Sequence, residues 1–64
     1  MRYMIQAEQD GKRIVATRTS PASAVVLAMK WVENGLTSVQ ILSEAGRAHD
    51  VSGAQRRLAQ GLRL

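Results

Sequence analysis

Residues 3–19 decide the fold, and they read YMIQAEQDGKRIVATRT. At their centre, Asp10-Gly11 favours a two-residue type I′ turn, because that turn needs positive φ at both central positions. Apolar and polar residues alternate on both sides of this pair, which is typical of half-buried strands. The stretch therefore predicts an antiparallel hairpin with strands at residues 3–8 and 13–19.

The two-residue turn also predicts the register of the hairpin. Tyr3 then faces Arg18, and Ile5 faces Ala16. We expect one face to be apolar, with Tyr3, Ile5, Ala7, Ile14 and Ala16. The other face is expected to be solvated and carries Met4, Gln6, Glu8, Arg13, Val15 and Thr17.

After the hairpin, the hydrophobic period changes from two to about 3.6, which predicts a helix over residues 21–33. Ser20 suits the N-cap, Pro21 suits the first helical position, and Asn34-Gly35 suits the end. The expected apolar stripe consists of Ala24, Val25, Ala28, Trp31 and Val32, with Leu27 and Met29 beside it. Because the alanines are small, we expect this helix to lie close to the sheet, with Trp31 as the largest contributor to the core.

A third strand is predicted at residues 37–42. Its alternation places three residues on one face: Thr37, Val39 and Ile41. A turn follows, and residues 47–51 predict a short fourth strand at a sheet edge, where its polar residues are tolerated. His49 is expected to be a solvated side chain near the end of that strand.

The last part of the chain predicts a short basic helix. Ser52, with Gln55 three residues later, matches a capping box and predicts a helix over residues 53–60. The order of elements is then β-β-α-β-β-α, an α+β two-layer sandwich in which residues 1–64 form one domain. The main helix packs on one face of the sheet. The sequence leaves open which face or edge the second helix covers.

Composition narrows the classes of function. The 64 residues include no Cys, which excludes a disulfide scaffold and a thiolate site and fits a cytoplasmic location. Tyr3 and Trp31 are the only aromatic residues, which limits the core of so small a chain and favours self-association. No stretch of about 20 apolar residues is present, so we expect no membrane segment.

No catalytic, cofactor or metal site is predicted. His49 and Asp50 are neighbours, and neighbours on a strand point to opposite faces, which argues against a hydrogen-bonded His–Asp pair. No serine lies in a GxSxG motif, and the glycines lack phosphate-binding spacing. One His and five scattered carboxylates make a poor metal site. We therefore expect a non-enzymatic protein without a cofactor or small-molecule substrate.

Positive charge is concentrated towards the C-terminus. The formal net charge is +4, of which residues 1–46 carry +1 and residues 47–64 carry +3. Four arginines are candidate contacts for an anion or a nucleic acid: Arg47, Arg56, Arg57 and Arg63. The alternative is a solvated helix face that interacts favourably with the helix dipole. Both aromatic residues are assigned to the core, so no stacking platform for single strands is expected.

A second candidate surface is the sheet face that the main helix leaves open. Met4, Val15 and Leu42 are apolar residues expected there among polar neighbours, and an edge strand stays free to pair. Ordinary exposure of isolated apolar side chains is the alternative. Protein–protein association or homodimerisation is the first predicted function. Weak nucleic-acid binding through the C-terminal arginines is the second.

The turn and cap signals also support a comparison with known small domains. These signals are Asp10-Gly11, Ser20-Pro21, Asn34-Gly35, Val39-Gln40-Ile41 and Ala45-Gly46-Arg47. With these features, residues 3–53 resemble small bacterial ββαββ domains of unknown function. The resemblance implies a fold but no site residues, and the C-terminal helix lies outside it.

Overall fold

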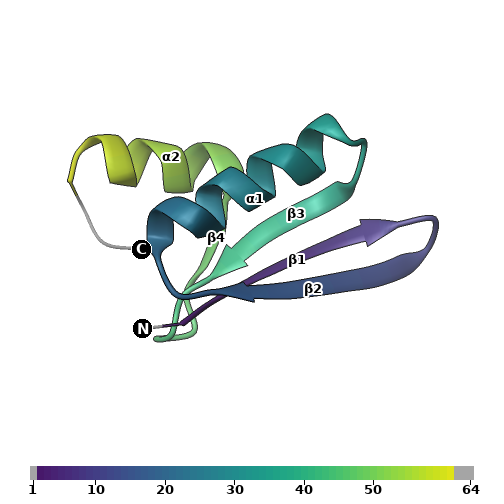
Figure 1. Ribbon diagram of the computed structural model, residues 1–64, viewed down its shortest axis with the longest axis horizontal. Coiled ribbons are helices and arrows are strands. Elements are labelled where there is room, and N and C mark those ends of the chain that lie inside the picture. The colour runs from purple at the N-terminus through teal and green to yellow at the C-terminus, as the bar shows by residue number, and fades with distance from the viewer. Residues whose placement is uncertain (1, 62–64) are drawn as a thin grey trace.

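The computed structural model describes residues 2–61, which form four strands and two helices (Figure 1). The elements are β1 (Tyr3–Gln9), β2 (Lys12–Arg18), α1 (Pro21–Glu33), β3 (Thr37–Leu42), β4 (Ala48–Asp50) and α2 (Val51–Ala59). The strands form one antiparallel sheet in the order β2-β1-β3-β4. This arrangement confirms the predicted α+β class and the order β-β-α-β-β-α. Neither described helix has the length and apolar character needed to cross a membrane.

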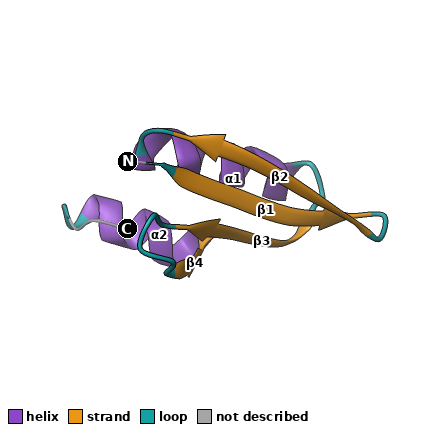
Figure 2. Cartoon of the chain, turned by 90° about the horizontal axis from the view of Figure 1, so that it is seen from below, coloured by secondary structure: helices purple, strands orange, loops and turns teal. Residues whose placement is uncertain are grey.

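The second helix packs on the same sheet face as the first. α2 contacts β3, β4 and α1, whereas α1 lies over β1, β2 and β3. Figure 2, which views the molecule from below, shows the strands in front of both helices. The opposite face of the sheet is therefore open to solvent.

The β1–β2 hairpin forms around the Asp10-Gly11 turn. Asp10 has a φ of 52° and Gly11 a φ of 78°, so both central residues adopt the positive φ of a type I′ turn. Tyr3 pairs with Arg18 at the far end of the hairpin, as predicted. Alternate residues of β1 from Tyr3 to Ala7 are consequently buried on the helix side.

The pairing of β3 with β1 contains an irregularity that the sequence did not predict. The register shifts near the start of β3, where Glu8 pairs with Thr37, and Ser38 has a φ of 54°. Such a bulge inserts one residue into a strand and interrupts its alternation. Val39 and Ile41 are buried as predicted. Thr37 was predicted on the same face but is exposed, because the bulge interrupts the alternation between it and Val39.

Helix α1 begins and ends where its cap residues predict. The Ser20 Oγ atom accepts a hydrogen bond from the Ser23 N–H at 3.1 Å, and Gly35 has a φ of 86°. The expected apolar stripe is only partly correct. Trp31 packs against the core but is only partly buried, and Val32 is 50% exposed. Val32 lines an open hollow between α1 and the first turn of α2, so half of its surface stays exposed.

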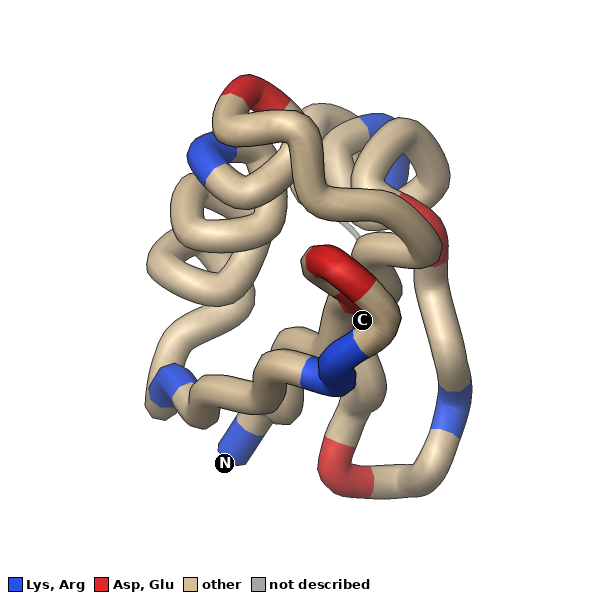
Figure 3. Tube along the Cα trace, turned by 90° about the vertical axis from the view of Figure 1, so that its right-hand side faces the viewer, with Lys and Arg blue, Asp and Glu red and all other residues tan. Residues whose placement is uncertain are grey.

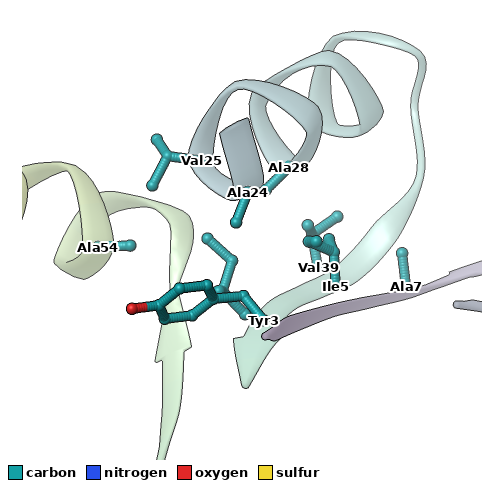
Figure 4. Packing of buried hydrophobic residues seen from close by; sticks show 9 residues of the cluster. Tyr3, Ile5, Ala7, Ala24, Val25, Ala28, Val39 and Ala54 are labelled. Carbon is teal, nitrogen blue, oxygen red and sulfur yellow. The ribbon is translucent and has the colours of Figure 1, made fainter. Parts of the chain in front are cut away.

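The core lies between the sheet and the two helices (Figure 4). Its buried members are Tyr3, Ile5, Ala7, Ala24, Val25, Ala28, Val39, Ile41 and Ala54. Ile5 and Ile41 are the largest side chains that are fully buried, and the Tyr3 ring extends towards α2. The core is therefore built from a few medium-sized side chains and many alanines.

We expect Ile41→Val to lower the free energy of unfolding by about 1 kcal/mol, because the lost methyl group leaves a void at a fully buried site. Val32→Ala removes two methyl groups from a half-exposed residue and should change that free energy by less than about 0.5 kcal/mol. Urea unfolding followed by circular dichroism measures both values. A larger cost for Val32→Ala than for Ile41→Val would contradict the observed packing of α1.

Candidate functional site

Asp50 determines where α2 begins. Its Oδ1 atom accepts a hydrogen bond from the Gly53 N–H at 2.7 Å, and the helix starts at Val51. The predicted helix start at Gly53 with Ser52 as N-cap is therefore wrong. A carboxylate is a favourable group at the positive end of the helix dipole. Gly53 leaves room for it, because a Cβ atom at that position would lie 2.6 Å from Oδ1.

The early start of α2 has two further consequences. The fourth strand ends at Asp50 rather than at the predicted residue 51. Gln55 makes no capping box, and its Nε2 atom instead donates to the Met29 Sδ atom at 2.9 Å. This contact joins the outer surfaces of α1 and α2.

We expect Asp50→Ala to lower the free energy of unfolding by about 1 kcal/mol, because it removes the acceptor for the Gly53 N–H. Ser52→Ala is the matched control and should leave that free energy nearly unchanged, since the Ser52 side chain is exposed within the first helical turn. Thermal unfolding of both variants measures the difference. Equal costs for the two substitutions would contradict the observed cap.

His49 lies on the helix side of the sheet and is less exposed than predicted. It pairs with Ile41 across β3 and β4, so its side chain shares the face that the helices cover. The residue is partly buried, and its Nε2 atom is buried without a hydrogen-bond partner in the described part of the chain. Asp50 uses its carboxylate in the helix cap, and among residues 2–61 no three His, Asp or Glu side chains form a metal-binding group.

We expect His49→Leu to raise the free energy of unfolding by about 1 kcal/mol, because it replaces a buried nitrogen that has no partner with an apolar side chain. His49→Gln keeps a polar side chain at the same place and should give no such gain. Urea titrations of the two variants provide the comparison. A loss of stability in His49→Leu alone would indicate that the imidazole contributes favourably.

The four candidate arginines occupy different elements. Arg47 is exposed in the β3–β4 turn, where its N–H donates to the Ser43 Oγ atom at 3.2 Å. Arg56 is exposed on α2, Arg57 beside it is partly buried, and Arg63 lies outside the described residues. Figure 3 shows basic and acidic positions interspersed along the chain rather than separated onto two sides. Binding of an anion or nucleic acid by these arginines stays a prediction.

The open sheet face brings the other three candidate residues together. Met4 lies directly opposite Leu42 across β1 and β3, and Val15 lies opposite Gln6 across β1 and β2. Met4 is 41% exposed, Val15 is 49% exposed, and Leu42 is partly buried. Ala48 of β4 pairs with Leu42. Met4, Leu42 and Ala48 thus form an apolar row across β1, β3 and β4.

A polar pair lies next to this apolar row. The Gln6 Nε2 atom donates to the Gln40 Oε1 atom at 3.1 Å, which joins the side chains of β1 and β3 across the open face. Alternation along each strand predicts that both glutamines are polar-face residues. Their contact depends on the pairing of β1 with β3, which local sequence patterns do not reveal.

A shallow hollow lies beside the apolar row. Met4 and Leu42 line it together with Thr17 and the charged residues Arg2 and Glu44, and its volume is about 530 Å³. The open face thus combines exposed apolar side chains, a hydrogen-bonded pair of amides and charges of both signs. Surfaces that bind another protein commonly mix apolar and polar residues in this way.

Comparison with protein-family models, curated proteins and solved structures finds no match to this chain. The resemblance to small bacterial ββαββ domains therefore stays a prediction. The candidate site rests on the geometry of the open sheet face alone.

Proposed function

We propose that the chain is a cytoplasmic, non-enzymatic association domain that forms a weak homodimer through the open face of its sheet. The observation that supports this proposal is the gathering of Met4, Val15 and Leu42 on a face that neither helix covers. Burial of these side chains against a second copy would add apolar contacts that the small core lacks.

The charges on this face suit contact between two identical surfaces. Arg13 lies opposite Glu8 across β1 and β2, and Arg2 and Glu44 both line the hollow. Asp50 is exposed at the β4 edge of the face. Because basic and acidic groups are mixed, two copies can meet without strong repulsion between like charges.

The size of the face indicates that the association is weak. β1 and β2 have seven residues each, β3 has six and β4 has three, so strands spaced by about 4.8 Å give a projected area of about 370 Å². A stable complex commonly buries about 800 Å² on each partner. The proposed dimer is therefore expected to be weak and to exchange with monomer.

Sedimentation velocity over a range of protein concentrations tests the proposal. The average mass of the parent chain should rise from monomer towards dimer as concentration increases. Met4→Glu places a charge in the contact and should keep the chain monomeric up to about 500 µM. Val32→Glu makes the same change of charge at a half-exposed site on α1 and should dimerise like the parent. If the average mass of the parent chain stays at the monomer value at every concentration, the proposed homodimer is wrong.

Weak nucleic-acid binding through α2 has less support. Arg56 is the exposed arginine of this helix, and Arg57 beside it is partly buried. Tyr3 is buried and Trp31 packs against the core, so neither aromatic ring offers an open stacking surface in the described part of the chain.

A further inference from the structure

β2 is an edge strand, and no other strand of residues 2–61 pairs with its outer side. The two-residue turn places the hydrogen bonds of the hairpin at alternate residues, so Ile14 and Ala16 direct their backbone groups towards β1. The N–H and C=O groups of Arg13, Val15 and Thr17 therefore point outward. The Arg18 Nη1 atom donates to the Thr17 carbonyl oxygen at 2.6 Å, which leaves the outward groups of the other two residues open to solvent.

A hollow lies beside this edge, between the end of β2 and α1. Its volume is about 360 Å³, and its lining residues are Arg18, Ala22, Ser23, Val26, Leu27 and Lys30. Val26 is 52% exposed, and Leu27 is partly buried and packs against the core. A strand added next to β2 would direct alternate side chains to the helix side of the sheet. The hollow can receive one apolar side chain from such a strand.

Two stretches of the chain are basic: residues 11–32, which border this edge, and residues 47–64, which carry a net charge of +3. Residues 11–32 contain four basic residues, Lys12, Arg13, Arg18 and Lys30, and no acidic residue. The other five basic residues of the chain balance its five acidic residues.

The two ends of residues 11–32 differ in how far nearby acidic residues offset their positive charge. Near the hairpin turn, Glu8 and Asp10 partly offset the charges of Lys12 and Arg13. No acidic residue lies among the residues that line the hollow. Arg18 and Lys30 therefore give the rim of the hollow a positive charge.

A second copy of β2 fits this edge poorly. An antiparallel pairing centred on Val15 would place Lys12 of each copy opposite Arg18 of the other, because their positions are symmetric about that residue. Like charges directly opposite each other are destabilising. An acidic strand would instead meet complementary charges along the same edge.

We propose that β2 binds an extended acidic peptide segment of another protein, which adds to the sheet as a fifth strand. Its backbone pairs with the outward groups of Arg13 and Val15, one apolar side chain enters the hollow, and its acidic side chains approach Arg18 and Lys30. This binding goes beyond the proposed homodimer, because it uses the edge of the sheet and the dimer uses its open face.

Fluorescence anisotropy with labelled peptides and the full chain tests the proposal. The probe is a peptide of about eight residues, a length that matches the seven residues of β2. Threonine occupies every second position, and the positions between carry one central valine flanked by glutamates, so that the valine and the glutamates share the helix-side face. One control peptide has lysine in place of each glutamate, and another has proline in place of a central threonine, whose N–H would point towards β2. We expect the acidic probe to bind with a dissociation constant below about 1 mM and both controls to bind at least about tenfold more weakly.

Paired variants of the chain separate the contributions of charge and backbone. The double variant Arg18→Glu, Lys30→Glu should weaken binding of the acidic probe at least about tenfold, whereas Arg47→Glu, Arg56→Glu makes the same change of charge elsewhere and should weaken it much less. Val15→Pro removes an outward N–H and should abolish binding, while Val15→Ala keeps that N–H and should bind like the parent. Circular dichroism of each variant confirms that it folds.

Several results would overturn the proposal. They are absence of binding up to about 1 mM, equal binding of the proline control, and equal losses in the two double variants. Equal affinity for an oligothymidine with the same dependence on Arg18 and Lys30 would indicate a general anion or nucleic-acid site instead. The outcome can be separated from homodimerisation, because Met4→Glu removes the dimer contact on the open face and should still bind the peptide like the parent.

Discussion

The register of the β1–β2 hairpin is the constraint on which the other contacts depend. Asp10 and Gly11 both adopt positive φ, and the two-residue turn that results allows one alignment of the strands. A shift of one residue would move Ile5 from the buried face to the open face. Because α1 follows β2 after two residues, the same register also places the start of that helix over the sheet.

The alanines of α1 explain why the helices cover a single face. Ala24 and Ala28 are fully buried, so the helix backbone can approach the sheet closely, with Ile5 and Ile41 filling the space beneath. These small side chains remove little apolar area from water, and α2 contributes one further buried alanine, Ala54. Within residues 2–61 no element covers the second face, so its apolar side chains stay exposed.

Local signals predicted the features that depend on neighbouring residues. The hairpin turn, its register and both ends of α1 follow from residues adjacent in sequence, and alternation alone placed Met4 and Val15 on one face. Placing Leu42 beside Met4 requires the pairing of β3 with β1, which joins distant parts of the chain. The exposure of Val32 likewise depends on the position of α2. At the start of α2, the capping-box pattern predicted Ser52 as the N-cap, but the carboxylate of Asp50 fills that role.

The position of Val15 shows how one strand serves two surfaces. Its side chain belongs to the open face, while its backbone N–H and C=O groups point outward from the sheet edge. Contact with the open face buries side chains and leaves the edge hydrogen bonds free, whereas addition of a strand uses those hydrogen bonds and leaves the open face exposed. The two surfaces also differ in charge, because the open face mixes both signs whereas the region from β2 into α1 is basic. The net charge of the chain does not distinguish these two surfaces. The alternation of residues along β2 does, because it directs side chains to the open face and backbone groups to the sheet edge.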